Sequence, residues 1–522
     1  MALSIPCRNI ASALALSGLL AAPYDLYAAT HSFVEPAPAT AVSTAASPVP
    51  DPYAALLDPI VHDPSLGKAL GAVHLVDVTS SSEVYAFNAD SPMLPASTMK
   101  IVTSAAALRV LGPAWRFDTD ILHDGELDAE GVLSGNLYVR GQGDPSLVVE
   151  RLWKMVLELR LRGVREVKGN VFFDGSFMDT DSGVPGWDKT EDQEEAPSYY
   201  PALGPLSLNF NTVAIWIGPG PDLGSPARLE IETSSPAVVV ENEVVTSGHR
   251  TRRSIRVERR VEDRKTIFEV RGQVPAGSTA RPTYRAVADA TAWFEGAFAT
   301  LCREADIRVK GRYTEGKTPE DAEMLVHGES PPLGVILQDL NKHSNNFMAE
   351  QVLKAMGAVA HGAPGTTGKG LRVVEEYLAS LGLPAEEYRF ANGSGLSRKT
   401  TLRAEHLTAV LVDMWKDRLV APEFLASLSI GGRDGTLRSR FRDDDLKGRI
   451  RGKTGSLNGV QCLAGYVEAP DGAVYAFAFL VNDVSGPLSR VRRVQDRFAG
   501  AVLGASPSAT LADVEEDEGT DE

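Results

Sequence analysis

Two polar residues at the start of an apolar segment have the types and the spacing of a nucleophile and its base. Ser97 is followed three positions later by Lys100, and the segment from there to Leu108 is mostly apolar. Pro95 and the small residues after it are typical of a helix start, so the pattern predicts a buried helix with Ser97 in its first turn. Lys100 would lie on the same face, close enough to take the hydroxyl proton. Free backbone N–H groups at the helix start could stabilise an oxyanion, so these residues favour acyl-transfer chemistry.

The spacing alone does not identify the site, because a second serine and lysine share it. Ser65 and Lys68 also lie three residues apart. Ser65 follows a proline and Gly67 lies between the two residues, which is a poor setting for a rigid helix. The apolar context therefore favours Ser97 over Ser65 as the nucleophile.

Two further short motifs carry groups that could complete such a site. Ser344 and Asn346 interrupt a helical pattern, which would place a hydroxyl and a carboxamide on a loop. Lys453 and Thr454 end a strand pattern, and Gly455 leads on to Ser456. A lysine and a hydroxyl at a strand edge can hold a substrate carboxylate and backbone, and the glycine allows a close approach. We therefore expect these two motifs to face Ser97 across one cleft.

The elements expected around the three motifs form an α+β domain. Strand patterns over residues 71–79 and 83–88 predict a hairpin before the Ser97 helix, and three more strands are expected over 450–454, 461–469 and 473–481. Helical patterns cover residues 286–307, 333–357, 370–381, 403–428 and 488–503. The sequence thus predicts an antiparallel sheet flanked by helices, which the N-terminal hairpin joins.

The segment between these two parts has a different texture. Residues 115–285 contain short alternating runs broken by Gly, Pro and Asp, with one helical pattern over 146–162. This predicts a large β-rich insertion of one or two small domains. The expected organisation is a catalytic domain split between residues 52–114 and 286–505, with residues 115–285 inserted into it.

The sequence predicts that the two ends of the chain lie outside the folded part. Arg8 followed by the apolar run 10–22 and small residues near Ala28 predicts a secretory signal peptide over residues 1–29, with an uncleaved anchor as the alternative. Residues 30–51 are rich in Pro, Ala, Ser and Thr, which is typical of a linker. Residues 506–522 predict a disordered tail, since seven of the last ten residues are acidic.

Charge and cysteine content exclude several classes of protein. The formal net charge of −17 argues against nucleic acid and against an anionic membrane surface as partners. The 522 residues and 43% hydrophobic content indicate a globular chain of more than one domain. Without the leader only Cys302 and Cys462 remain, which allows one disulfide at most and excludes a disulfide scaffold.

The order of the three motifs resembles the penicilloyl-serine transferases, which share Ser-x-x-Lys, Ser-x-Asn and Lys-Thr-Gly. The chain is most similar to the class C low-molecular-mass penicillin-binding proteins, a group of D-Ala-D-Ala carboxypeptidases and endopeptidases with a large insertion after the first motif. The resemblance extends from about residue 57 to residue 503. It includes the stretches 141–145, 185–187, 206–211, 392–398 and 432–437.

The resemblance implies roles for the acylation machinery. Ser97 would be the acylated nucleophile, Lys100 its general base, and Ser344 the relay that brings a proton to the leaving amine. The backbone N–H groups of Ser97 and Ser456 would form the oxyanion hole. Because Lys100 acts as a base only when neutral, its pKa must lie well below the usual 10.4; burial and the charge of Lys453 would both lower it.

The resemblance also implies the substrate contacts. Asn346 would hold the acyl-side amide, while Lys453, Thr454 and Gly455 would hold the terminal carboxylate end of the peptide. Arg398 matches a position at which relatives contact the free end of a diaminopimelate side chain. An acidic residue after Trp187, such as Asp192, would take the amine of that group. The chain departs from the pattern at Asn392, where relatives often carry Asp.

Taken together, the resemblance implies an enzyme of the bacterial cell wall. The expected substrates are peptidoglycan stem peptides, with β-lactam antibiotics as covalent inhibitors, no cofactor and no metal. The expected location is the periplasm, without a stable membrane anchor once the leader is removed. Two alternatives remain open, namely a serine β-lactamase and a catalytically inactive peptidoglycan-binding module. The balance of carboxypeptidase and endopeptidase activity also remains open, because both bonds follow a D-Ala.

Overall fold

The computed structural model describes residues 52–187 and 196–504. The predicted signal peptide, linker and acidic tail, as well as Asp192, lie outside the described residues. No helix within the described ranges is both long and apolar enough to span a bilayer.

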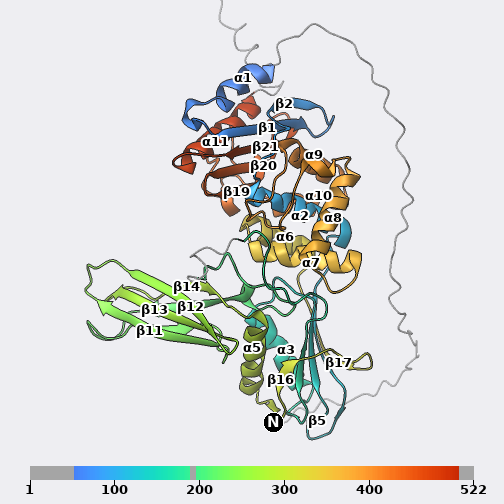
Figure 1. The fold of residues 1–522 in the computed structure, drawn as a ribbon, viewed down its shortest axis with the longest axis vertical. Coiled ribbons are helices and arrows are strands. Elements are labelled where there is room, and N and C mark those ends of the chain that lie inside the picture. Colours follow the sequence, from blue (N-terminus) through green and yellow to red (C-terminus); the bar gives the residue numbers. More distant parts are fainter. Residues whose placement is uncertain (1–51, 188–195, 505–522) are drawn as a thin grey trace, which may run out of the picture. The chain divides into compact units, whose positions relative to one another are not determined.

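A six-stranded antiparallel sheet joins the two ends of the described chain (Figure 1). Its order is β18 (Ser429–Ile430), β19 (Ile450–Leu457), β20 (Val460–Glu468), β21 (Val474–Asn482), β1 (Leu70–Asp77) and β2 (Glu83–Phe87). β1 pairs with β21 along its whole length, so the N-terminal hairpin extends the C-terminal meander. The predicted α+β fold, with an antiparallel sheet built from both ends of the sequence, is confirmed.

Alternation of residue size along β21 explains how helices cover both faces of this sheet. Phe477 and Phe479 point into the core shared with α1 (Pro52–Val61) and α11 (Leu488–Gly504). Ala476 and Ala478 point to the opposite face, into the core shared with α2 (Met99–Leu111) and α9 (Ala404–Lys416). Small side chains on that face leave room for α2, which is buried from Met99 to Leu108.

The remaining helices of this part pack around α2. They are α6 (Leu333–Lys342), α7 (Asn346–His361), α8 (Thr367–Ser380) and α10 (Ala421–Ser427). The helical pattern over 333–357 is two helices, as its interruption at Ser344 predicts; Ser344 has a left-handed φ of 55°, and Asn346, expected on the loop, is the first residue of α7. The pattern over 403–428 likewise contains α9 and α10. α2 ends at Leu111 and is capped by Gly112, whose φ is 79°.

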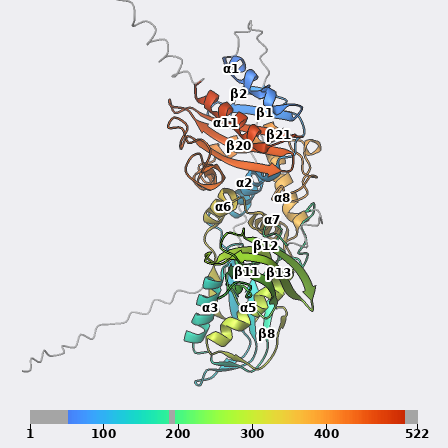
Figure 2. The same ribbon diagram turned by 90° about the vertical axis from the view of Figure 1, so that its left-hand side faces the viewer.

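The region after α2 contains four smaller sheets (Figures 1 and 2). Their strands are β3 (Asp118–His123), β4 (Glu126–Leu127), β5 (Val132–Ser134), β6 (Leu137–Gly141), β7 (Glu166–Val167), β8 (Val171–Asp174), β9 (Thr212–Gly218), β10 (Arg228–Ile231), β11 (Val238–Ser247), β12 (Ser254–Glu262), β13 (Lys265–Pro275), β14 (Arg281–Ala286), β15 (Arg308–Val309), β16 (Tyr313–Glu315) and β17 (Glu323–Glu329). Two helices, α3 (Val149–Leu161) and α5 (Ala290–Glu304), share their hydrophobic core.

Strand pairing shows how far this inserted part continues along the chain. β15 pairs with β7, β16 with β8 and β17 with β3, although all three strands follow residue 285. α5 is buried in the same core as β6 and β8. We therefore propose that the insertion ends near residue 330, later than the boundary at 285 that the sequence pattern suggests.

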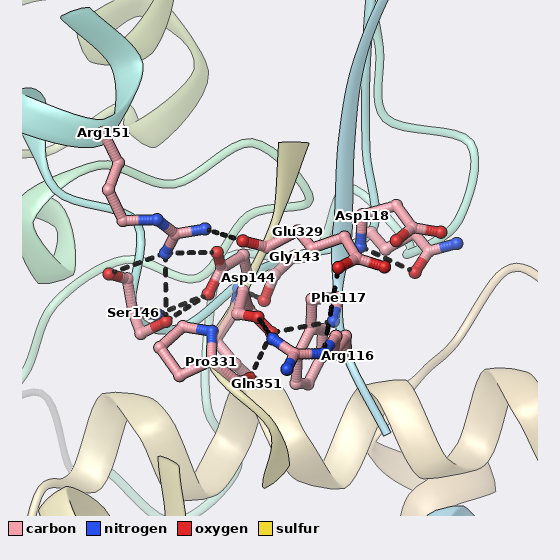
Figure 3. A network of polar contacts seen from close by, with 12 residues as sticks. Arg116, Phe117, Asp118, Gly143, Asp144, Ser146, Arg151, Glu329, Pro331 and Gln351 are labelled. Carbon is pink, nitrogen blue, oxygen red and sulfur yellow. Dashed lines mark hydrogen bonds and ion pairs between the residues drawn. The ribbon is translucent and has the colours of Figure 1, made fainter. Parts of the chain in front are cut away.

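A polar network lies where the chain returns from the inserted part (Figure 3). The guanidinium of Arg151 on α3 donates to the Glu329 carbonyl at 2.7 Å and pairs with the Asp144 carboxylate at 2.9 Å. From α7, the Gln351 amide donates to the Gly143 carbonyl at 3.2 Å. The 141–145 stretch noted in the sequence therefore links the insertion to the helix that follows Ser344.

The two remaining cysteines do not pair with each other. Cys302 lies in the core of the inserted part and Cys462 on β20, and both are free thiols. Burial raises the pKa of each thiol to about 12, so both are expected to stay unreactive at neutral pH.

Candidate active site

Ser97 and Lys100 lie within hydrogen-bonding distance, as their spacing predicts. The Lys100 Nζ is 3.0 Å from the Ser97 Oγ. Ser97 lies in a 3₁₀ turn (Ala96–Thr98) directly before α2, and not in the first turn of the α-helix itself. The turn begins with Ala96 at a φ of 47°, a left-handed conformation that is rare for a non-glycine residue.

The amine of Lys100 has two further partners, both carbonyl oxygens. The distances are 2.8 Å to Asn346 Oδ1 and 2.7 Å to the backbone oxygen of Ser394. A neutral amine has two N–H groups and one lone pair, and a carbonyl oxygen can only accept. When Lys100 is neutral, its two N–H groups are used by Asn346 and Ser394. Its lone pair is then left for the hydroxyl of Ser97.

Burial sets the protonation of this amine. Lys100 is fully buried, and the loss of hydration lowers its pKa to about 7, while the charge of Glu350 acts in the opposite direction. Lys453 is also fully buried; burial and the charge of Lys100 lower its pKa well below the usual value. The lowered pKa of Lys100 makes a neutral base available near pH 7.

This pKa predicts the pH dependence of acylation. As the pH rises through about 7, Lys100 loses its proton and becomes able to accept the one from Ser97. The second-order rate constant for acylation by a β-lactam should rise tenfold per pH unit below about 7 and level off above it. Stopped-flow measurements between pH 5 and 9 would check this; a rate that is flat over this range would contradict it.

The second motif lies between α6 and α7 and contacts both lysines. Asn346 is the first residue of α7 and contacts Lys100, while the Ser344 Oγ is 2.8 Å from Lys453 Nζ. Lys453 Nζ also donates to the backbone oxygen of Thr454 at 2.8 Å. Residues of this one short turn therefore contact both Lys100 on α2 and Lys453 on β19.

The third motif lies along a strand edge next to Ser97. β18 pairs with β19 only at Arg451 and Gly452, so no strand of the described chain covers that edge from Lys453 onward. A Cβ on Gly455 would lie 2.6 Å from the Pro95 carbonyl oxygen and 3.1 Å from the Ser97 nitrogen. Only glycine allows β19 to approach the Ser97 turn this closely.

The other residues of this strand lie on its accessible side. The Thr454 hydroxyl is 2.9 Å from that of Thr436, which belongs to the 432–437 stretch noted in the sequence. Ser456 is exposed next to Gly455. Arg398 is exposed, and its guanidinium donates to the backbone oxygen of Asn458 in the turn after β19. Arg398 is thus outside the hydrogen-bond network around Lys100.

The second Ser-x-x-Lys pair has no such surroundings. Ser65 is exposed in a 3₁₀ turn (Pro64–Leu66), and its backbone N–H donates to Asp63. Lys68 is exposed as well. The structure therefore favours Ser97 over Ser65 as the nucleophile, in agreement with the sequence context.

Two functional groups were missed by the sequence analysis, both near the amine of Lys100. The Ser394 carbonyl lies in the 392–398 stretch, in which the resemblance implied a role for Arg398 alone. Glu350 on α7 is fully buried and accepts backbone hydrogen bonds from that stretch. The available signal was an acidic residue within a mostly apolar helical pattern. Asn392, where relatives often carry Asp, accepts from the Gly395 N–H at 2.9 Å and so closes the turn.

Close packing of this turn against the Ser97 turn leads to a prediction about Gly395. Its φ is +73°, and an added Cβ would lie 2.0 Å from the Ala96 carbonyl oxygen. Gly395→Ala should slow acylation and lower the melting temperature. Gly382→Ala is the matched control, because its φ of +79° is similar but nothing lies within 4 Å of the added Cβ. The control should lose about 1 kcal/mol of stability from backbone strain and keep its acylation rate; equal effects of the two substitutions would contradict the prediction.

Metal-ligating side chains gather at two other places in the described residues. One cluster is Asp118, His327 and Glu329, and the other is Glu387, Glu405 and His406. Neither contains a residue of the three motifs.

Comparison with known proteins agrees with this arrangement. The model of the D-Ala-D-Ala carboxypeptidase 3 (S13) family matches residues 53–500. A D-alanyl-D-alanine carboxypeptidase of Actinomadura sp. (strain R39) is 32% identical over 459 residues, covering 85% of this chain and 83% of the relative. D-alanyl-D-alanine carboxypeptidase DacB of Haemophilus influenzae is 26% identical over 404 residues, covering 76% and 82%.

A solved structure shows the same fold. The crystal structure of penicillin binding protein 4 from Haemophilus influenzae superposes with a TM-score of 0.73 at 23% identity, covering 85% of this chain and 97% of the other. The protein belongs to the D-Ala-D-Ala carboxypeptidase 3 (S13) family. The predicted class, a serine-type D-Ala-D-Ala carboxypeptidase or endopeptidase among the class C penicillin-binding proteins, is confirmed.

Proposed function

We propose that the enzyme cleaves peptidoglycan stem peptides through an acyl-enzyme on Ser97. Neutral Lys100 takes the proton of the Ser97 hydroxyl, and the Ser97 Oγ attacks the carbonyl carbon of a D-Ala residue. The backbone N–H groups of Ser97 and Ser456 hold the oxyanion that forms. When the C–N bond of the scissile amide breaks, the proton held by Lys100 passes through the hydroxyl of Ser344, which contacts Lys453, to the leaving amine, and Lys100 is neutral again. Water then hydrolyses the ester and regenerates Ser97.

One observation carries this proposal, namely the set of partners around the Lys100 amine. Two carbonyl oxygens occupy its N–H groups, which directs the lone pair of the neutral amine to the Ser97 oxygen at 3.0 Å. The burial that lowers the pKa of Lys100 to about 7 supports its role as a base near neutral pH.

The substrate is proposed to bind along the open edge of β19. Its backbone would extend the sheet beside Lys453, Thr454 and Gly455, as peptides often bind at a free strand edge. The Asn346 carboxamide, whose Nδ2 donates to the Tyr199 carbonyl at 3.2 Å, would contact the acyl-side amide. Lys453 and Thr454 would hold the terminal carboxylate. Arg398, exposed beyond the end of β19, is proposed to contact a charged side chain of the stem peptide.

The predicted leader and the proposed substrate together suggest where the enzyme acts. We infer that the enzyme acts in the periplasm, to which the predicted leader would direct it. β-Lactam antibiotics are proposed to acylate Ser97 and to block it. A structural relative, penicillin binding protein 4 of Haemophilus influenzae, is known in complex with a β-lactam, which supports this inference.

Mass analysis of muropeptides tests the proposal directly. Purified uncross-linked and cross-linked muropeptides are incubated with the enzyme, and loss of a terminal D-Ala or cleavage of the cross-link is expected. Which of the two dominates gives the balance of carboxypeptidase and endopeptidase activity. Binding of muropeptides without any cleavage would indicate a binding module, and rapid turnover of a penicillin would indicate a β-lactamase; either result would overturn the proposal.

A further inference from the structure

A buried carboxylate on α7 holds the loop that contacts the base. Glu350 is fully buried one helical turn after Asn346. Its two oxygens accept hydrogen bonds from the backbone N–H groups of Gly393 at 3.1 Å and Ser394 at 2.7 Å. The carbonyl of the same Ser394 accepts from Lys100 Nζ at 2.7 Å. One side chain thus joins α7 to the loop that orients the amine.

The same helix contacts Lys100 at a second point. Asn346 and Glu350 are four residues apart, so both lie on one face of α7. Asn346 contacts the amine directly, and Glu350 contacts it through Ser394. Both carbonyl partners of Lys100 are therefore held in place by α7, which fixes the direction of the lone pair.

Charge gives Glu350 a second effect on the base. Three ionisable side chains are fully buried near the nucleophile, namely Lys100, Lys453 and Glu350. The charged groups that act on Lys100 are Glu350 from α7 and Lys453 from β19, while the 392–395 stretch offers only backbone and uncharged side chains. When the O–H bond of Ser97 breaks and an N–H bond forms on Lys100, an ammonium arises in this buried site, close to Lys453. Burial raises the pKa of Glu350, but its two backbone N–H donors and the charge of Lys100 favour the carboxylate, whose negative charge compensates the ammonium.

We propose that Glu350 is a positioning residue for acylation, which fixes the Ser394 carbonyl against the Lys100 amine and stabilises the ammonium that Lys100 becomes. This inference rests on the proposed roles of Ser97 and Lys100. Its two parts, geometry and charge, are separable by two substitutions of the same side chain.

Glu350→Gln keeps the size of the side chain and removes its charge. The amide has one acceptor oxygen, so its NH₂ group would face one of the two N–H donors of the loop. Because the carboxylate raises the pKa of Lys100, its loss should move the acidic limb of the acylation rate to lower pH by about one unit or more. The plateau rate should fall about tenfold or more, since the loop loses a hydrogen bond and the ammonium loses its counter-charge.

Glu350→Asp keeps the charge and shortens the side chain by one methylene. Its acidic limb should stay close to that of the wild type, while its plateau rate falls because the carboxylate no longer reaches both N–H groups. Gln351→Met is the matched control, since it removes buried hydrogen bonds of the next residue on α7 to Gly143 and Gly204 of the inserted part. Its melting temperature should fall and its acidic limb should not move.

The measurement is the rate of acylation of purified full-length variants by a fluorescent penicillin between pH 5 and 9, with folding checked by circular dichroism. The wild type and Glu350→Gln are compared by the pH at which the acylation rate falls on the acidic side. If this pH is the same in both, and the wild type is acylated normally, the role of Glu350 is overturned and the proposed function stays intact. Wild-type protein that is not acylated at Ser97 would instead contradict the proposed function. If Glu350→Gln does not fold, Glu350→Asp provides the test. A plateau acylation rate of Glu350→Asp that equals that of the wild type would overturn the proposal.

Discussion

Replacement of Ser97 by alanine is expected to abolish covalent labelling by a fluorescent penicillin and to lower D-Ala release by at least about 10⁴-fold. The substitution removes the oxygen that lies 3.0 Å from the Lys100 amine and leaves no other nucleophile in the acyl-transfer step. The fold should remain, because alanine fits a turn that already contains Ala96 next to it. Gel fluorescence after incubation, together with the melting temperature, checks the prediction.

Ser65→Ala provides the matched control for this experiment. Ser65 has the same Ser-x-x-Lys spacing but is exposed on a surface turn. The control should be labelled as fast as the wild type. Stoichiometric labelling of the Ser97 variant, or loss of labelling in the Ser65 variant, would remove Ser97 from the mechanism.

Replacement of Lys100 by methionine is expected to slow acylation by about 10²- to 10⁴-fold, the usual contribution of a general base. Methionine fills much of the same buried space but cannot accept a proton, and it leaves the Asn346 and Ser394 carbonyl oxygens without their donor. The remaining rate should lose the acidic limb near pH 7, because the group that titrates there is gone. Stopped-flow acylation over the same pH range measures both effects.

Lys68→Met is the corresponding control, since Lys68 is the exposed lysine of the second motif. Its acylation rate and pH profile should match those of the wild type. A Lys100→Met variant that is acylated at the wild-type rate would show that another group takes the proton of Ser97.

Much of the catalytic part could be predicted because its signals are local. The β1–β2 hairpin, the β20–β21 hairpin and α2 are apolar segments bounded by turn residues. The three motifs were identified by residue type and order, and the structure brings Ser97, Lys100, Ser344, Asn346 and Lys453 together as expected. The pKa shift of Lys100 followed from its place in an apolar helix.

The features that were not predicted depend on contacts between distant residues. The 3₁₀ turn at Ser97 begins with a left-handed Ala96, which neighbours such as Gly395 and Gly455 hold in place by close packing. Strands β15 and β16 have two and three residues, too few for a periodic pattern, so their pairing with β7 and β8 was not visible. The position of Glu350 depends on its two N–H partners at Gly393 and Ser394, which lie 43 and 44 residues further along the chain.

The central claim is that Ser97 forms the acyl-enzyme, and peptide mapping of a β-lactam adduct tests it most directly. The wild-type protein is incubated with a penicillin, digested and analysed by tandem mass spectrometry. We expect one adduct per molecule, on the peptide that contains Ser97 and at the Ser97 oxygen. An adduct on another residue, or a protein that hydrolyses D-Ala-D-Ala peptides without ever carrying an adduct at position 97, would contradict the claim.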